Sequence, residues 1–186
     1  MKKNLLFTFL TAIILLVSVL NSVSAEENHS DTLVVFFSAT GTTKNIAERI
    51  AAMTNADIYE IIPVQPYTDA DLNWNDSKSR TSIETADAGC RPEIEGDPLD
   101  LEGYSTIYIG YPIWWGDIPR IMSTFAESYD FEEITMIPFC TSMSSGVGQS
   151  DKHLKEQAEN GNWMKGTRFS SSISDADLQD WINNQK

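Results

Sequence analysis

Cysteine and histidine, the usual ligands of zinc and other transition metals, are scarce in this sequence, which has two of each among 186 residues. They are scattered along the chain and match no recognisable metal-site spacing. The Cys-x5-Arg loop of phosphatases is also absent, because Gly146 stands where the arginine would follow Cys140. The sequence therefore predicts neither a bound metal nor a cysteine-based phosphatase.

Basic residues are also few. The sequence has 13 lysines and arginines and 27 aspartates and glutamates, which gives a formal charge of −14. Lys2 and Lys3 belong to the terminal segment described next, and without them 11 basic residues remain and the charge is −16. A surface of this sign repels nucleic acid and anionic lipid. It suits a basic partner protein, or it serves solubility alone.

Long apolar runs are absent except near the start of the chain. The two lysines precede an apolar run over residues 5–20, and Val23-Ser24-Ala25 supplies small residues at the usual cleavage spacing. The run is short for a membrane span of about 20 residues. We expect a cleaved signal peptide at 1–25, a mature domain at 26–186, and a secreted or extracytoplasmic protein. Export would permit a disulfide between the two cysteines, but the sequence does not place them at bonding distance.

Five short apolar segments follow, and each is typical of a buried β-strand. Between them, apolar residues recur at helical spacing, as Ile46, Ile50 and Met53 do after Thr42. Alternation of strands and helices predicts a parallel sheet with helices on both faces. We therefore expect an α/β fold with a doubly wound, five-stranded parallel sheet. The predicted strands are residues 32–37, 57–62, 106–111, 134–140 and 165–170.

Several predicted helices carry start signals. Pro119 suits the first turn of a helix, with Asp117 as its expected cap. Ser174 and Asp177 resemble a capping box before the last helix. The polar stretch at 63–103 contains four prolines, so we expect a long loop there with at most a short helix near residues 77–86.

The loop after the first strand is the first candidate site, because ligands of such folds bind at the carboxyl ends of the strands. A helix N-terminus exposes unpaired N–H groups and a partial positive charge, which suit a phosphate. Hydroxyl side chains add donors, and glycine lets the backbone approach closely. A cap alone would need only one threonine. The candidate phosphate contacts are Ser38, Thr40, Gly41, Thr42 and Thr43.

The glycines of the commoner nucleotide loops are missing here. A Walker A loop needs two glycines followed by Lys-Ser or Lys-Thr, whereas Gly41 precedes Thr-Thr-Lys-Asn. The dinucleotide fingerprint needs three glycines, and this loop has one. The loop therefore suits a ligand with a single terminal phosphate better than a nucleotide with two or three phosphates.

Adjacent tryptophans mark the loop after the third strand. Side chains alternate near a strand end, so Trp114 and Trp115 are expected in different environments. One is expected in the core and the other at the cleft, where a flat aromatic ligand can stack on it. The candidate contacts in this loop are Pro112, Ile113, Trp114, Trp115 and Gly116.

Small residues fill the loop after the fourth strand, from Thr141 to Gly148. They leave backbone N–H and C=O groups free to contact the polar edge of a ring, although a disordered loop would have the same composition. The candidate contacts in this loop are Thr141, Ser142, Met143 and Gly146.

Together, the Ser-x-Thr-Gly-x-Thr loop, the Trp-Gly-Asp turn and the Gly/Ser loop resemble the flavodoxin family. The segment YPIWWGDIPR is similar to an exported bacterial branch, and the resemblance covers about residues 32–183. It implies the strand order 2-1-3-4-5 and the cofactor FMN, with its phosphate in the first loop and its isoalloxazine flanked by the other two. The candidate residues would then contact FMN, with Trp114 or Trp115 beside the ring.

The sequence departs from the family in its third loop, where the usual stacking tyrosine is missing and Met143 occupies the neighbourhood. Tyr67 and Trp74, in the long polar stretch, are candidate substitutes. Arg80 could meet an anionic substrate there, or it could form a surface ion pair.

The resemblance implies redox chemistry that the flavin supplies and the protein tunes. Acidic residues such as Asp117 near the ring predict a low potential, and no side chain stands out as catalytic. We expect a low-potential electron carrier whose partner is a basic protein or a small quinone-like acceptor. An FMN-dependent NAD(P)H quinone-type oxidoreductase and a non-enzymatic extracellular FMN-binding module remain alternatives.

Overall fold

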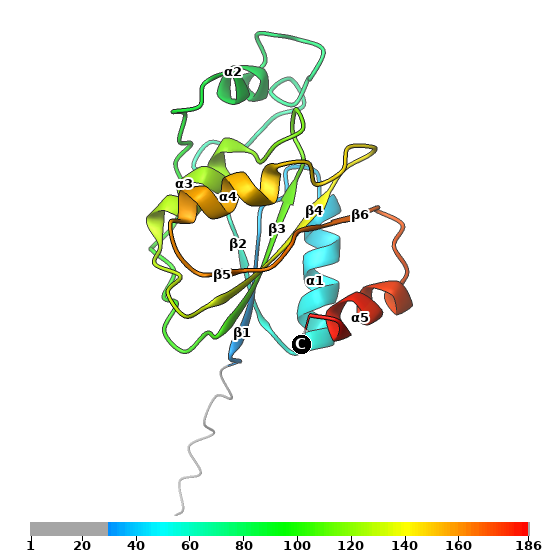
Figure 1. The fold of residues 1–186 in the computed structure, drawn as a ribbon. Coiled ribbons are helices and arrows are strands. Elements are labelled where there is room, and N and C mark those ends of the chain that lie inside the picture. Colours follow the sequence, from blue (N-terminus) through cyan, green and yellow to red (C-terminus); the bar gives the residue numbers. More distant parts are fainter. Residues whose placement is uncertain (1–29, 186) are drawn as a thin grey trace, which may run out of the picture.

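The computed structural model describes residues 30–185, and the signal peptide predicted at 1–25 lies outside these residues. Strands and helices alternate along most of the chain (Figure 1). In chain order the elements are β1 (Thr32–Phe36), α1 (Thr42–Thr54), β2 (Asp57–Glu60), α2 (Arg80–Ala86), β3 (Thr106–Pro112), α3 (Arg120–Ser128), β4 (Thr135–Thr141), α4 (Ser150–Ala158), β5 (Asn162–Trp163), β6 (Thr167–Phe169) and α5 (Asp175–Asn183).

The strands form one parallel sheet in the order β2-β1-β3-β4-β5, with β6 also paired to β4. This arrangement confirms the predicted doubly wound α/β fold and the order 2-1-3-4-5. The fifth position of the sheet holds two short strands, whereas the sequence predicted a single strand at 165–170.

Pro138 explains the division of the fifth position. On this side of β4, Met136 accepts a hydrogen bond from the Met164 N–H (2.9 Å), and two residues further on Pro138 has no N–H to donate. Opposite Pro138, residues 164–166 leave the ladder, and pairing resumes in β6 with one extra residue. The proline therefore produces a bulge in the outermost strand.

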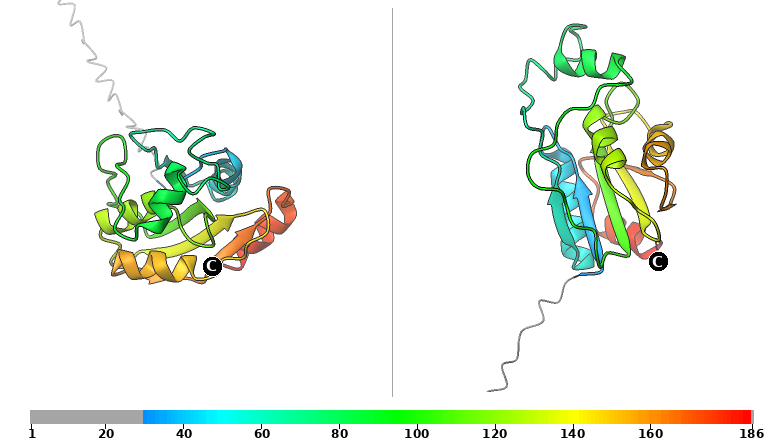
Figure 2. Two further views of the ribbon diagram at one scale, coloured as in Figure 1. Left: turned by 90° about the horizontal axis from the view of Figure 1, so that it is seen from above. Right: turned by 90° about the vertical axis from the view of Figure 1, so that its left-hand side faces the viewer.

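Helices cover both faces of the sheet (Figures 1 and 2). Side chains alternate along β1, so that Val34 packs in the cluster with α1 and α5, and Val35 packs in the cluster with α3 and α4. Both clusters consist of fully buried apolar side chains. The two cores hold the carboxyl ends of β1, β3 and β4 side by side at one edge.

Of the two predicted helix caps, one is confirmed and the other is wrong. Ser174 accepts a hydrogen bond from the Asp177 N–H (3.1 Å), which confirms the capping box of α5. The cap predicted at Asp117 is wrong, because α3 begins after Pro119 without a side-chain cap. The Asp117 carboxylate instead contacts the Ile118 N–H and His153.

The polar stretch at 63–103, called the arm below, rises past the carboxyl ends of the strands (Figures 1 and 2). Its base is closed by an antiparallel bridge between Pro63 and Ile94, and it contains the short helix α2, as predicted. In a doubly wound fold, a helix that covers one face of the sheet would connect β2 to β3. Here the arm makes this connection, and its helix α2 lies beyond the carboxyl end of the sheet (Figure 1).

Candidate functional site

The three predicted loops meet at the carboxyl edge of the sheet. The hydroxyl groups of Thr43 and Thr141 share a buried hydrogen bond of 2.8 Å, which joins the first loop to the third. The Ile113 N–H donates to the Thr141 carbonyl (2.9 Å), which joins the second loop to the third. Phe37, at the end of β1, packs edge-on against Trp114 with ring centroids 5.5 Å apart. Each loop is thus connected to both others.

The first loop presents an uncapped helix N-terminus. Gly41 occupies the N-cap position of α1 with φ at 84°, a value that favours glycine, and no side chain caps the helix. Among residues 30–185, no hydrogen-bond partner is found for the hydroxyl groups of Ser38, Thr40 and Thr42. No acidic residue lies in the first turn. Free N–H groups and free hydroxyl groups therefore surround one positive helix end, as an anion site requires.

Thr43 differs from the other predicted phosphate contacts. Its side chain is buried, and its hydroxyl faces Thr141 rather than solvent. Lys44, in the same turn, forms an ion pair with Glu60 at 2.6 Å, and this pairing raises the pKa of the lysine. Charge neutralisation by a lysine is therefore not built into this loop, and the donors are neutral groups.

The second loop turns sharply at Trp115 and Gly116. Two hydrogen bonds of 2.9 Å join Trp114 and Asp117, one from each N–H to the other residue's carbonyl. Trp115 and Gly116 both have positive φ, at 49° and 80°, as in the type I′ turns of β-hairpins. Glycine adopts this conformation readily, but a tryptophan there is a strained exception.

The two indoles have the different environments that alternation predicted. Trp114 is half-buried and packs against Phe37 and Tyr67. Trp115 is 46% exposed at the tip of its turn. Pro112 and Ile113 are half-buried and support the turn. Trp115 is thus the indole that is available to a ligand.

The third loop is held by a residue that the sequence did not single out. The Arg168 guanidinium, from β6, donates to the carbonyls of Ser142 (2.6 Å) and Met143 (3.0 Å). Its Nε also donates to the Ser142 hydroxyl at 3.2 Å. Met143 and Gly146 are exposed, and Met143 is 100% exposed. Knowing that β6 pairs beside β4 would have placed Arg168 next to this loop.

The beginning of α4 supports the second loop. An ideal Cβ on Gly148 would lie 3.3 Å from the Gly116 carbonyl oxygen, so the two loops touch through backbone. One turn into α4, His153 Nδ1 lies 3.0 and 2.9 Å from the two carboxylate oxygens of Asp117. The second and third loops are therefore one connected unit.

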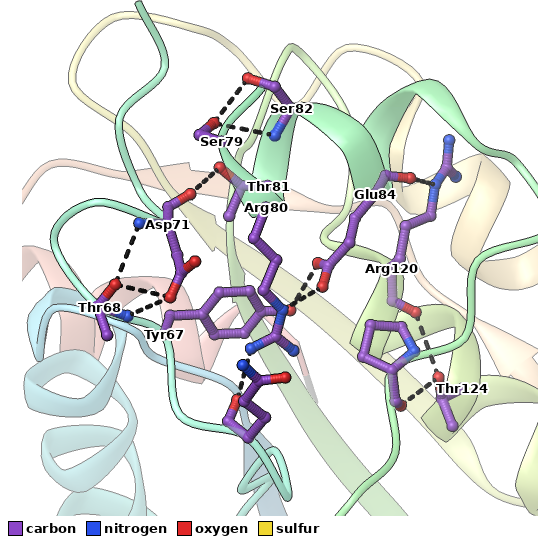
Figure 3. A network of polar contacts seen from close by, with 12 residues as sticks. Tyr67, Thr68, Asp71, Ser79, Arg80, Thr81, Ser82, Glu84, Arg120 and Thr124 are labelled. Carbon is purple, nitrogen blue, oxygen red and sulfur yellow. Dashed lines mark hydrogen bonds and ion pairs between the residues drawn. The ribbon is translucent and has the colours of Figure 1, made fainter. Parts of the chain in front are cut away.

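The arm is anchored by a polar network that includes Tyr67 (Figure 3). The Tyr67 ring packs against Trp114, with ring centroids 5.2 Å apart. The Tyr67 hydroxyl donates to Glu84 (2.7 Å), and Arg80 Nε donates to the other oxygen of the same carboxylate (2.6 Å). The Arg80 guanidinium also lies over the Tyr67 ring, 4.0 Å from its centroid. Arg120, from α3, donates to the Thr85 carbonyl at the end of α2 (2.9 Å). Arg80 thus forms an ion pair, but the pair is largely buried and not at the surface as expected, since the Glu84 side chain is only 9% exposed.

This network limits what the arm can offer a ligand. One face of Tyr67 is covered by Arg80, and its edges contact Phe37 and Trp114. Trp74, in contrast, is 73% exposed. Of the two proposed substitutes for a stacking tyrosine, only Trp74 has an open ring.

Two tyrosines and a buried cysteine near the site stay neutral at pH 7. Burial and the hydrogen bond to Glu84 raise the pKa of Tyr67 well above its usual range. Burial does the same for Tyr111, and it raises the pKa of the Cys140 thiol to about 12. Cys140 and Cys90 are both free thiols. Neither Cys140 nor these tyrosines can therefore act as a base or an anionic nucleophile near pH 7.

Neither a metal site nor a membrane-spanning helix is found within residues 30–185. No group of three or more histidine, cysteine or acidic side chains could hold a metal ion. In the same part of the chain, the helices are too short or too polar to cross a bilayer. The arrangement that remains is a donor-lined anion site beside an exposed indole, which suits an aromatic ligand that carries one phosphate.

Comparison with known proteins gives consistent results. Residues 31–185 match the family described as flavodoxin. A crystal structure of a protein from Bacteroides uniformis, assigned as a flavoprotein, shares 43% identity with a TM-score of 0.79, and the match covers 83% of this chain and 99% of that one. A similarly assigned protein from Bacteroides eggerthii shares 40% identity with a TM-score of 0.77, covering 82% and 96%.

A more distant structure shares the fold. It is a flavoprotein from Lactobacillus acidophilus in complex with FMN, with 24% identity and a TM-score of 0.61, and the match covers 81% of this chain and 97% of that one. No curated protein sequence matches the chain.

Proposed function

The chain belongs to the flavodoxin family, and from that premise we propose that it binds FMN and carries electrons at low potential. FMN, when bound, supplies the redox chemistry, whereas the protein binds it, orients it and sets its potential. The single observation that carries the proposal is the uncapped N-terminus of α1, around which three hydroxyl groups have no partner within residues 30–185.

The fit to a phosphate follows from the first loop. Ser38, Thr40 and Thr42 would donate hydroxyl hydrogen bonds, and Gly41 would let backbone N–H groups approach the phosphate oxygens. Thr43 would act indirectly, because its hydroxyl already bonds to Thr141. A charged acceptor strengthens each such hydrogen bond, so neutral donors suffice without a lysine.

The fit to a flat ring follows from the other two loops. Trp115 would stack on the ring, and the third loop would offer the backbone N–H groups of Ser142 and Met143 to its polar edge, because Arg168 already donates to their carbonyls. The Trp115–Gly116 turn is kept in place by its own two hydrogen bonds and by α4. This support favours Trp115 over Trp114 as the ring contact.

The proposed low potential rests on charge. Acidic residues outnumber basic ones by 27 to 13, and Asp117 lies two residues from Trp115. Negative charge near the ring opposes the addition of electrons. The same surface favours a basic protein as redox partner.

The arm supports a second candidate function, an FMN-dependent NAD(P)H oxidoreductase with a quinone-like acceptor. It stands at the carboxyl edge of the sheet, beside Trp114, and leaves the Trp74 ring exposed. A wall of this kind suits a pocket for a small acceptor. A binding module without redox partners is the third reading, and it requires only the FMN site.

We also propose that the protein is exported. The support is the basic start of the chain, its apolar run at 5–20 and the small residues at 23–25. N-terminal sequencing of the mature protein tests this proposal, since cleavage after Ala25 would leave Glu26 as the first residue.

The spectrum of the purified mature chain tests the proposed cofactor. A yellow protein whose released ligand has the mass of FMN is expected, and a colourless protein that ignores added FMN would contradict the proposal. Anaerobic mixing with NADPH then separates the functions. Rapid bleaching indicates the reductase. Slow bleaching with a stable one-electron state during stepwise reduction indicates the carrier. If neither result is obtained, the binding module is the function that remains.

A further inference from the structure

The strained turn at Trp115 and Gly116 needs support from outside itself. A bulky residue at positive φ costs on the order of 1 kcal/mol or more and persists only where the surroundings impose it. Trp115 is 46% exposed, so core packing does not impose its conformation. The turn ends at Asp117, and the contacts of that residue show what holds it.

Asp117 is fixed by two donors. Its Oδ1 accepts from the Ile118 N–H at 2.8 Å, and both carboxylate oxygens face His153 Nδ1. A ring nitrogen placed between two carboxylate oxygens carries the proton, so Nδ1 is the donor. His153 is the one side chain from another element that hydrogen-bonds the Asp117 carboxylate within residues 30–185.

The helix behind His153 is rigidly placed. Leu154 and Ala158 of α4 are buried in the core. At the start of α4, the Ser150 hydroxyl donates to the Val147 carbonyl (2.6 Å) and lies 3.1 Å from the buried Tyr111 hydroxyl. Gly148, just before α4, lies against the Gly116 carbonyl. A helix held in this way can transmit its position to the turn.

We propose that His153 is a positioning residue that holds the Trp115–Gly116 turn through Asp117 and offsets the charge of that carboxylate beside the ring. The second part rests on the proposed FMN function. His153 acts on the ring only through Asp117 and is not itself expected to touch FMN.

The neighbouring charges on α4 do not duplicate this role. Asp151 accepts hydrogen bonds from the N–H groups of Gly166 and Lys152. The Lys152 ammonium lies 3.6 Å from Glu156. Loss of His153 would therefore leave Asp117 with the Ile118 N–H alone, and its negative charge would act more strongly on a nearby ring.

The test compares His153→Leu, which removes the donor, with His153→Gln, which keeps an N–H donor on a side chain of different shape. Lys155→Gln is the matched control, because Lys155 is an exposed residue of the same helix. Each variant is examined for hydrogen exchange of the Asp117 amide, which bonds to the Trp114 carbonyl. FMN affinity and midpoint potential are measured on the same preparations, and thermal unfolding confirms that each variant is folded.

In His153→Leu, we expect exchange of the Asp117 amide to be about tenfold faster or more, as the loss of a charge-assisted hydrogen bond predicts. FMN should bind more weakly and its potential should fall. His153→Gln should restore part of both the exchange rate and the potential, because it keeps a donor to Asp117, and Lys155→Gln should change neither.

The two possible failures are distinguishable. Exchange in His153→Leu equal to that of the wild type would overturn the positioning role, whether or not FMN binds. A wild-type protein that does not bind FMN would overturn the proposed function, and with it the effect on potential. Equal loss of potential in Lys155→Gln would show a general charge effect and would overturn the specific role of His153.

Discussion

Thr42 and Thr43 are neighbours with the same side chain, yet their hydroxyl groups differ in their contacts. Thr43 is buried and bonds to Thr141, so it ties two loops together. Thr42 is half-buried and, like Thr40, has a hydroxyl without a partner among residues 30–185. Substitutions at these positions therefore separate ligand binding from stability.

Replacing Thr40 and Thr42 together by alanine is expected to weaken FMN binding tenfold or more, because a hydrogen bond to a charged group contributes about 1.5–3 kcal/mol. Quenching of flavin fluorescence gives the dissociation constant. Thr54→Ala is the matched control, since the Thr54 hydroxyl bonds to the Ile50 carbonyl at the other end of α1. An unchanged constant in the double variant would show that these hydroxyl groups do not contact the phosphate.

Thr43→Val is expected to lower the free energy of unfolding by about 1–3 kcal/mol, because it leaves the buried Thr141 hydroxyl without its partner. Valine has nearly the same shape, so a cavity is not the cause. The double variant Thr43→Val/Thr141→Val should lose less than the sum of the two single losses. Urea unfolding measures all three, and strict additivity would mean that the bond does not couple the loops.

At the scale of elements, the alternation of strands and helices along the chain was predictable because most strands are short apolar runs next to a helix of different period. Their spatial order, 2-1-3-4-5, came from the resemblance to the flavodoxin family and not from periodicity. The carboxyl-edge site followed from that order, since parallel strands end together. The divided fifth strand was not predicted, although Pro138 is visible in the sequence. Its effect depends on which side of β4 its missing N–H faces, and only the register determines that.

The contacts among the loops also could not be predicted from the sequence. Arg168 and His153 reach their loops from elements far along the chain, and no local motif announces either contact. The Trp114-Trp115 pair was interpretable in part, because alternation separates the two side chains. The positive φ of Trp115 was not, since a tryptophan carries no signal for that conformation.

One glycine within a strand gives an element-scale prediction. Gly110 of β3 pairs with Phe139 of β4, and an ideal Cβ there would lie 2.2 Å from the Phe139 ring. Gly110→Ala is therefore expected to destabilise the protein by about 1–3 kcal/mol through overpacking. Gly89→Ala is the control, because its nearest neighbour lies at 3.4 Å. Equal unfolding midpoints in urea would show that β3 and β4 can move apart without cost.

At the scale of the whole molecule, several buried groups must stay protonated for the fold to persist. The pKa of Tyr104 is raised to about 12 by burial and by its hydrogen bond to Asp57. The pKa of Cys140 is raised to about 12 by burial, and those of Tyr67 and Tyr111 are raised further. A raised native pKa means that the folded state holds its proton more tightly than the unfolded chain does.

Stability should therefore be constant below pH 9 with respect to these groups and fall from there toward pH 12. Cys140 begins to contribute above its ordinary pKa of 9.0, and the tyrosines above 10.0. The free energy of unfolding, measured with urea between pH 8 and 10, should fall in the wild type and fall less in Cys140→Ala. The two decreases should differ by about 1 kcal/mol at pH 10. Identical pH profiles would show that the Cys140 thiol ionises as easily in the folded protein as in the unfolded chain.

The bulge at residues 164–166 has a consequence for how molecules of this protein meet one another. An uninterrupted outer strand offers a template to which a second molecule can add its own strand, and such addition can continue into fibrils. Here the template is broken into pieces of two and three residues, too short to register an incoming chain. Pro138, which costs the sheet part of its ladder, is therefore expected to reduce aggregation at that edge in concentrated solutions of the protein.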